Sequence, residues 1–589
     1  MTCLFFGAIA EFPICASTAP AFDDSAFTEL INSPSIEGIF ILNVKARDIL
    51  RLPALDVPLE PLASYPICAE YLDDAFSAVL QDLDLWFSDR VYSTSPQDTV
   101  FPNLAPRASL VQAMDFSQTI PAVPNSGTRS QISTGIAKIN NANGELNSII
   151  ESSTIRNRTI TLRFGPLYDE VRDVTGALVT KRYADLGLGI ELAQYVGSDW
   201  SADRGEVSIH TRNVREVLNG FIHQSYYLGT GAEEGDFELT GSAKPVMFGD
   251  CFNVTPILIN RAFLVYQIHF SRVQAINVVR DMGTVLPYAG DYPSFNALAL
   301  APLAPGEWAS CLAEGMFRLG AAAAGIVTCD ALGAVFASGY YQDAGELLFF
   351  VAVEYGRVSS TDLEAPSILG LPTGAMGRYY DGSEPDARVA NFYDDILSSL
   401  NGWFGLSRQR KVRAGLNVDP STAPINYTVQ SYQIQADGLT REESTDVTRA
   451  SQSLRYKKNW TPLTDDQIAL GVSPAERLLL KSDGQIVQRA SSIARIIDES
   501  AEDFGPIDTY ISDATLAGSI AQRIIDVEEI PRQRWRLKMP RSAILWVEGQ
   551  TVEVFTSLYG FDGGKRFVIT GVNGRISQRK LEMEFELRG

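Results

Sequence analysis

The most regular pattern of apolar and polar positions lies near the end of the chain. Apolar residues recur there at the spacing of a helix with one buried face, at Leu516, Ile520, Ile524 and Val527. Ser512 or Asp513 can cap the first turn of this helix, because short polar side chains accept hydrogen bonds from its free backbone N–H groups. Pro531 ends it.

Alternating apolar residues after Pro531 predict strands with one buried face. The alternating residues are Trp535, Leu537 and Met539; Val552 and Val554; Phe567 and Ile569; and Leu581, Met583, Phe585 and Leu587. Glycines in residues 571–574 predict a turn between the last two of these strands. The simplest interpretation is a helix followed by a four-stranded antiparallel sheet or small barrel.

Shorter patterns predict elements in the rest of the chain. Strands are expected at residues 36–42, 159–164, 245–249, 258–270 and 425–434, where β-branched and aromatic residues gather or alternate. Helices are expected at residues 70–86, 214–219 and 389–400. The polar run 437–453 is the best candidate for a linker or a solvated insertion loop.

These patterns predict an α+β fold that is predominantly β, with several small sandwich- or barrel-like domains and short helices. A chain of 589 residues is long enough for three or four domains. We expect a mixed, strand-rich domain at 1–160, a β-rich hub-like domain at 161–335, a β-rich domain with a helix and linker at 336–460, and a helix with an antiparallel barrel at 461–589.

Composition excludes several classes of protein. The net charge of −22 argues against a surface that grips nucleic-acid phosphates, although a negative wall lets DNA slide past without binding. The six cysteines form no CxxC pair and have no histidine at ligand spacing, so each is expected to be a small buried residue in a reducing cytoplasm. No apolar run approaches the roughly 20 residues of a membrane-spanning helix, and the N-terminus lacks the basic segment of a signal peptide.

Catalytic chemistry has few candidates in this sequence. There are only three histidines, and His269 lies in a strand-like apolar run, where a core histidine with satisfied hydrogen bonds is expected. His210 and His223 have no cysteine partner at ligand spacing. The glycine-rich run 229–235 has the wrong spacing for a nucleotide loop, and the acidic loop 381–386 lacks the spacing of a calcium site. The adjacent carboxylates Asp394-Asp395 and Glu528-Glu529 receive no role. We therefore assign no catalytic, cofactor-binding or metal-binding residue.

An ordered set of segments resembles a family of known proteins. The segments are 87–98 (FSDRVYSTSPQD), 133–146 (STGIAKINNANGEL), 241–256 (GSAKPVMFGDCFNVTP), 264–269 (LVYQIH), 279–283 (VRDMG), 290–292 (GDY), 317–320 (FRLG) and 324–330 (AGIVTCD). Together they resemble the hub-type structural proteins of siphophage tail tips, or baseplates. The resemblance covers mainly residues 85–335 and does not extend to the first 80 residues. Gly249 is expected to permit a tight turn within it.

The resemblance implies a non-enzymatic hub that forms a homotrimer with further copies of itself. It would be located in the virion tail tip after synthesis in the host cytoplasm. Its other expected partners are the distal tail protein, the tape measure protein and a central fibre or larger tip protein, with DNA only in transient passage. The alternative is a receptor-binding or glycan-degrading tail component, for which Tyr340, Tyr341, Tyr379, Tyr380 and Trp403 could line a sugar cleft.

Overall fold

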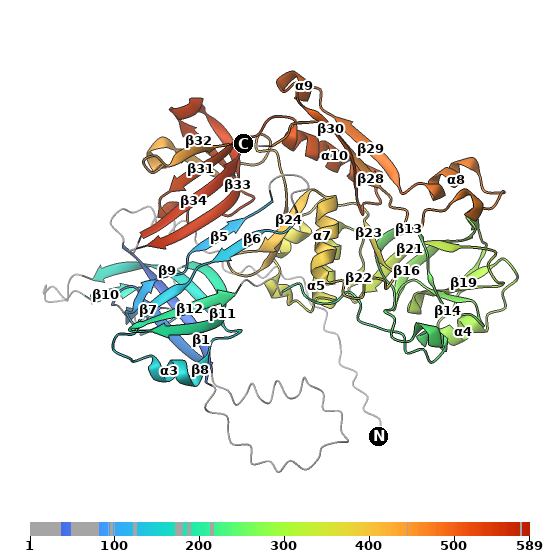
Figure 1. The fold of residues 1–589 in the computed structure, drawn as a ribbon, viewed down its shortest axis with the longest axis horizontal. Helices are drawn as coiled ribbons and strands as arrows, with labels where there is room; N and C mark the ends of the chain where they lie inside the picture. The colour runs from blue at the N-terminus through green and yellow to red at the C-terminus, as the bar shows by residue number, and fades with distance from the viewer. Residues whose placement is uncertain are drawn as a thin grey trace, which may run out of the picture.

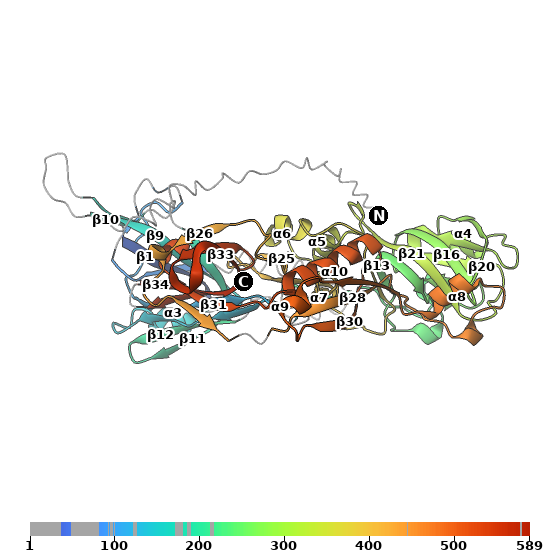
Figure 2. The ribbon, with the colours of Figure 1, turned by 90° about the horizontal axis from the view of Figure 1, so that it is seen from above.

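The computed structural model describes residues 37–48, 82–91, 93–94, 98, 100–121, 127–170, 181–184, 190–212, 217–443, 446–577 and 580–589. The described chain is α+β and predominantly β, with several separate sheets and short helices, as predicted. The molecule is elongated, with two large sheets at one end and a five-stranded sheet at the other (Figures 1 and 2). No described helix is long and apolar enough to cross a membrane.

The first large sheet has ten strands, in the order β2-β1-β9-β11-β12-β7-β4 with three short strands beside this path. Its main strands are β1 (Glu37–Asp48), β2 (Asp82–Ser88), β4 (Leu110–Gln112), β7 (Ala137–Asn140), β9 (Thr159–Glu170), β11 (Ile190–Asp203) and β12 (Glu206–Arg212). The short strands are β3 (Ser93–Thr94), β8 (Ser153–Thr154) and β10 (Lys181–Ala184), and helix α3 is Asn147–Ser152. The predicted alternation in β9 is confirmed, because Ile160, Leu162 and Phe164 are all buried.

The prediction of a helix at residues 70–86 is wrong for residues 82–86, the part of this range that the structure describes. Residues 82–86 belong to β2, which pairs antiparallel with β1 and sets Leu85 opposite Val44. Leu83 and Leu85 alternate there with Asp82 and Asp84, so the local period is two and not 3.6. Residues 70–81 lie outside the described residues.

The second large sheet has eight strands, in the order β26-β32-β33-β34-β31-β27, with the hairpin β5–β6 attached to β33. Its strands are β5 (Phe116–Thr119), β6 (Gln131–Thr134), β26 (Tyr427–Gln430), β27 (Leu439–Glu442), β31 (Arg534–Met539), β32 (Thr551–Thr556), β33 (Phe561–Ser577) and β34 (Lys580–Arg588). All four predicted C-terminal strands are present, and their alternating apolar residues are buried. Only part of the strand expected at 425–434 forms, as β26, and a 3₁₀ turn follows it.

The turn predicted at residues 571–574 is wrong, because β33 runs through these glycines to Ser577. Gly571 pairs with Thr119 and Gly574 with Phe116, so β5 lies against β33 at this place. A Cβ atom on Gly574 would lie 2.1 Å from the Phe116 ring. The glycines therefore make room for another strand instead of turning the chain.

The predicted C-terminal helix is α10 (Ala514–Glu528), and the Asp513 side chain caps it. α10 packs on a separate three-stranded sheet of β28 (Arg449–Tyr456), β29 (Gln485–Ala490) and β30 (Glu502–Asp508), in the order β29-β28-β30. Helices α8 (Pro474–Lys481) and α9 (Ala494–Ile497) lie in the same stretch of chain. The run 437–453 is not a linker over its described residues, because it contains β27 and the first part of β28.

The centre of the molecule holds helices α5 (Ala344–Glu354), α6 (Ala365–Leu369) and α7 (Val389–Ser399), with the hairpin of β24 (Gly402–Leu406) and β25 (Val412–Leu416). The helix predicted at 389–400 is thus confirmed as α7. The helix predicted at 214–219 is wrong in its described part, because Val217 and Leu218 form a turn; residues 213–216 lie outside the described residues.

Two further sheets extend from this centre. One has six strands, in the order β17-β16-β21-β13-β23, with β22 attached to β21. The other has five, in the order β14-β15-β20-β19-β18. Their bounds are β13 (Val246–Val254), β14 (Ile257–Asn260), β15 (Val265–Gln267), β16 (Val273–Asp281), β17 (Thr284–Val285), β18 (Tyr288–Asp291), β19 (Trp308–Cys311), β20 (Met316–Leu319), β21 (Val327–Phe336), β22 (Gly339–Tyr340) and β23 (Gly377–Tyr380), with helix α4 at Phe295–Ala299.

Gly249 does not form the expected turn, because it lies inside β13. Its φ is +65°, and a Cβ atom would lie 1.9 Å from the carbonyl oxygen of Met376. Glycine is needed here for the close approach of β23 and not for a reversal of the chain.

The two large sheets share one hydrophobic core. Side chains of the first sheet, such as Leu162 and Ile209, belong to the same buried cluster as Trp535 and Phe585 of the second. The second sheet combines strands from residues 116–134, 427–442 and 534–588. We call this pair of sheets the barrel body. Domain limits near 160, 335 and 460 remain a prediction.

Candidate functional site

The three histidines have different hydrogen-bond partners in the structure. His269 is fully buried, its Nδ1 accepts a hydrogen bond from the Met247 N–H at 3.2 Å, and burial lowers its pKa to about 3. This confirms the predicted core histidine. His223 Nδ1 lies 2.9 Å from the Lys244 carbonyl oxygen, and burial lowers the pKa of this side chain. His210 contacts the Ser201 hydroxyl at 2.9 Å.

The described cysteines are buried thiols. Cys251, Cys311 and Cys329 form no disulfide, and burial raises the pKa of each thiol. They fit the prediction of small buried residues. Cys3, Cys15 and Cys68 lie outside the described residues. Across the described ranges, no three His, Cys, Asp or Glu side chains gather closely enough to hold a metal ion.

The aromatic residues considered for a sugar cleft are largely core residues. Tyr379, Tyr380 and Trp403 are at most 5% exposed, so these three are core residues and do not line an open cleft. Arg378 lies 4.0 Å from the Tyr380 ring and binds Asp395 at 2.7 Å. This cluster stabilises the centre of the molecule and leaves no open aromatic surface at these three residues.

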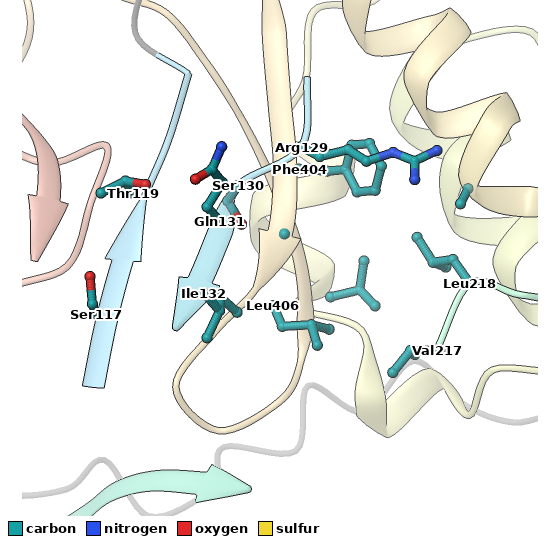
Figure 3. Close-up of a pocket in the computed structure, with 13 residues that line it drawn as sticks. Ser117, Thr119, Arg129, Ser130, Gln131, Ile132, Val217, Leu218, Phe404 and Leu406 are labelled. Atoms are coloured by element: carbon teal, nitrogen blue, oxygen red, sulfur yellow. The ribbon is translucent and has the colours of Figure 1, made fainter. Parts of the chain in front are cut away.

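A cavity of about 610 Å³ lies where the barrel body meets the central helices, and we call it the joint pocket (Figure 3). The hairpin β5–β6 contributes Ser117, Thr119, Gln131 and Ile132 to one side. The rest of the lining consists of Arg129, Ser130, Val217, Leu218, Ala390, Phe404, Gly405, Leu406 and Val412. Its size is typical of small-molecule pockets.

Backbone hydrogen bonds position the walls of the joint pocket. The Ser130 N–H donates to the Phe404 carbonyl at 2.7 Å, and the Phe404 N–H donates to the Thr128 carbonyl at 2.7 Å. A Cβ atom on Gly405 would lie 1.6 Å from the Ser130 hydroxyl oxygen, so only glycine permits this approach. The β5–β6 hairpin therefore connects β33 of the barrel body to β24 of the centre.

The charges at the joint pocket are paired. Arg129 Nε lies 3.1 and 2.9 Å from the two carboxylate oxygens of Asp394, and the Thr128 hydroxyl also donates to Asp394. The hydrogen bond to Asp394 raises the pKa of Arg129. No histidine or cysteine lines the pocket. It can therefore accommodate an apolar group, but it has no nucleophile–base pair to activate one.

A second connection between the barrel body and the centre is a buried ion cluster. Arg413 pairs with Glu548, with side chains 7% and 1% exposed. Arg408 donates to the carbonyls of Ile544 at 2.6 Å and Trp546 at 2.9 Å. Burial raises the pKa of Glu548 although both arginines act to lower it. The two arginines and a backbone hydrogen bond therefore oppose the effect of burial on the pKa of this carboxyl group.

A third connection ties α10 and β28 to the barrel body. Arg449 pairs with Glu528, both side chains being at most 5% exposed. Arg588 lies 3.5 Å from Glu528 and 2.8 Å from Asp446, and Asp446 also binds Arg534 at 2.6 Å. Burial raises the pKa of Glu528, whereas the arginines lower that of Asp446 below its usual range.

Every member of the carboxylate pairs that the sequence left without a role has a polar partner, and two of them, Asp394 and Glu528, belong to these connections. Asp394 binds Arg129, Asp395 binds Arg378, Glu528 binds Arg449, and Glu529 accepts from the Ser491 hydroxyl. The two carboxylates of each pair therefore bind different partners. The sequence identified these carboxylates because they are adjacent, but it did not identify their arginine partners, which lie up to 265 positions away.

Comparisons with known proteins gave distant structural similarities. No protein-family model and no curated protein matches the sequence. A chain of a native gene transfer agent virion matches with 13% identity, 59% of this chain and 85% of that chain covered, and a TM-score of 0.38. A tail protein from Neisseria meningitidis MC58 matches with 10% identity, coverage of 82% and 95%, and a TM-score of 0.33. A 43 kDa tail protein of prophage MuSo2 from Shewanella oneidensis has 7% identity, coverage of 81% and 92%, and a TM-score of 0.31. Scores this low do not establish a shared fold.

Proposed function

We propose that this chain is a non-enzymatic structural subunit of a long-tailed phage tail tip, a hub onto which neighbouring tail proteins dock. The ordered resemblance of residues 85–335 to siphophage hub proteins supports this function. The observation that carries the proposal is the set of buried contacts that hold the barrel body and the centre of the molecule together. The barrel body has one core made from distant segments, and its β5–β6 hairpin and two buried ion clusters connect it to the rest.

This arrangement suits a subunit that must keep several docking surfaces in fixed positions. Breaking a buried ion pair leaves an uncompensated charge, so the connections resist separation of the parts. A nucleophile–base pair or a metal site would need its residues gathered at one place. Among the described residues no three His, Cys, Asp or Glu side chains gather closely enough to hold a metal ion, and neither a histidine nor a cysteine lines the joint pocket.

The proposed partners are further copies of this chain in a homotrimer, the distal tail protein, the tape measure protein and a central fibre or larger tip protein. DNA is proposed to pass without stable binding, because the net charge of −22 repels phosphates. The virion tail tip is the proposed location.

Mass spectrometry and immunogold labelling of purified virions test the proposal. We expect the protein in every particle, at the tail end away from the head, and tails that fail to mature when its gene is deleted. Absence from purified virions would contradict the proposal. Release of reducing sugar from host polysaccharide by the purified protein would instead support the glycan-degrading alternative.

A further inference from the structure

The three-stranded sheet that α10 covers has an open edge at β29. The order of this sheet is β29-β28-β30, so β28 pairs with one side of β29 and no described strand pairs with its other side. The elements that pack against β29 are β28 and α10. Figure 1 shows β29 at the rim of the molecule. β29 is therefore an edge strand, and its outer backbone groups are available for pairing.

The hydrogen bonds of the sheet identify the residues whose backbone groups point outward. The Ser491 N–H donates to the Ala450 carbonyl at 2.8 Å, and the next pair along the ladder is Ala490 opposite Ser451. In an antiparallel pair of strands, residues that bond to the partner strand alternate with residues whose N–H and C=O groups point away from it. Three residues of β29 therefore direct these groups away from β28: Ile486, Gln488 and Ala490.

The side chains of these three residues are exposed as well. Val487 faces α10, where a Cβ atom on Gly518 would lie 3.9 Å from its side chain. Because side chains alternate along a strand, the three outward residues lie on the sheet face opposite α10. Ile486 is 59% exposed, and Ile496 of α9, the helix that follows β29, is 80% exposed. The open edge thus has exposed apolar side chains in addition to free backbone groups.

The other edge of the same sheet is protected. β30 has exposed acidic side chains at Glu502, Asp503 and Asp508, and its Pro506 has no N–H to donate. Charged residues and proline are the usual means by which proteins prevent an edge strand from pairing with another chain. β29 has the sequence QIVQRA, with no proline and a single charge. The sheet therefore blocks one edge and leaves the other open.

The single charge of β29 indicates the chemistry of a partner. Arg489 is exposed, and its Nη1 donates to the Gln488 carbonyl at 3.1 Å, which places the guanidinium at the open edge. A carbonyl oxygen has two lone pairs, so Gln488 can still accept from a second donor. Among the described residues no carboxylate pairs with Arg489. A carboxylate is the group that a guanidinium binds best, through two parallel hydrogen bonds.

We propose that β29 is a docking edge on which a neighbouring tail protein adds an extended strand, with an acidic side chain at Arg489 and an apolar side chain at Ile486. The backbone of the added strand bonds to the three outward residues of β29. In strand addition the main-chain hydrogen bonds supply affinity, and the side-chain contacts select the partner. The assignment of the partner to the phage tail rests on the proposed function.

Hydrogen exchange measured by mass spectrometry tests the docking edge. Exchange is followed in peptides that cover residues 485–490, for the free full chain and for the chain in purified virions. We expect the outward amides to exchange rapidly in the free chain and at least about tenfold more slowly in virions, because an amide bonded within a sheet exchanges only after local opening. Equal exchange of β29 in the free chain and in virions would overturn the proposal.

Substitutions in β29 test the same edge through assembly. Gln488→Pro removes one outward N–H and leaves the bonds to β28 in place, because this N–H points away from β28. Its incorporation into virions should fall by roughly fivefold or more, since a hydrogen bond to the partner is lost. The matched control, Gln488→Ala, keeps the N–H and should be incorporated as the wild type is.

Ile486→Lys keeps the test valid if proline disturbs the fold. It places a charge on the open edge without changing the backbone, so it should also reduce incorporation. The isolated Ile486→Lys variant should melt at the temperature of the wild type, because Ile486 is exposed in the free chain. Incorporation of both Gln488→Pro and Ile486→Lys at the wild-type level would overturn the proposal.

The oligomeric state of the free chain identifies the occupant of the edge. Sedimentation should give the same mass for the wild type and Gln488→Pro, because the added strand belongs to another protein. Dissociation of an oligomer by Gln488→Pro would assign the edge to a second copy of this chain and overturn the proposal. Failure of the tail-tip function is distinguishable, since the chain would then be absent from virions. Failure of the docking edge alone would leave the chain in virions with β29 still exchanging rapidly.

Discussion

Removal of the Glu548 carboxylate tests the strength of the connection between the barrel body and the centre. Glu548 is almost completely buried, and Arg413 and Arg408 are its cationic neighbours. Glu548→Ala leaves these guanidiniums without their carboxylate. Loss of one partner from a buried ion pair costs about 3–5 kcal/mol. We therefore expect the free energy of unfolding to fall by about this amount.

Urea unfolding followed by tryptophan fluorescence measures the effect, and one of the seven tryptophans, Trp403, has the Arg413 guanidinium 5.1 Å from its ring. The matched control is Glu238→Ala, which removes a carboxylate whose pair with Arg261 is about two-thirds exposed. An exposed pair contributes about 0–1 kcal/mol, so this variant should remain near the wild type.

A double substitution separates the ion pair from its surroundings. Arg413→Met with Glu548→Leu replaces both charges by apolar groups of similar size, which is often neutral for a buried pair. We expect it to recover most of the stability lost in Glu548→Ala. A loss below about 1 kcal/mol in Glu548→Ala, or no recovery in the double variant, would refute the reasoning.

Three further predictions concern single elements. Gly574→Ala places a methyl group against the Phe116 ring, so it should detach the β5–β6 hairpin and expose it to limited proteolysis. Gly505→Ala is the control, because open space surrounds Gly505 and the β5–β6 hairpin of this variant should stay protected. Equal cleavage of the two variants would contradict this prediction. Truncation before Leu581 removes β34, which pairs with both β31 and β33, so calorimetry should show loss of the barrel-body transition; an unchanged transition would be inconsistent with the sheet. Folding lowers the pKa of His269, so the unfolded chain takes up a proton first as the pH falls. The contribution of His269 to stability is therefore fully present above pH about 6.5 and is lost as the pH falls towards about 3. His269→Gln should show a smaller loss of melting temperature over this range, and identical pH profiles of the two proteins would count against this prediction.

The sequence pattern correctly predicted the elements in which the apolar residues recur on one face and that face is buried. α10, α7, β9 and β34 follow their sequence patterns because one face of each packs on a single neighbouring sheet or helix layer. The same logic failed for residues 82–86, where a helical spacing extended into a strand. It also failed for residues 571–574, where glycines accommodate β5 from more than 450 positions earlier in the chain.

The connections between the parts of the molecule could not be predicted from sequence. Asp394 and Glu528 were visible as members of carboxylate pairs, but their arginine partners are distant in sequence. Burial and partner identity arise from tertiary packing, and one sequence carries no record of them.

Cryo-electron microscopy of intact virions tests the central claim most directly. The account predicts density for this chain at the end of the tail tube, repeated around the tail axis, with the barrel body and the centre in the relative positions that their buried ion pairs fix. Virions whose tail tip has no density that fits this fold would contradict it.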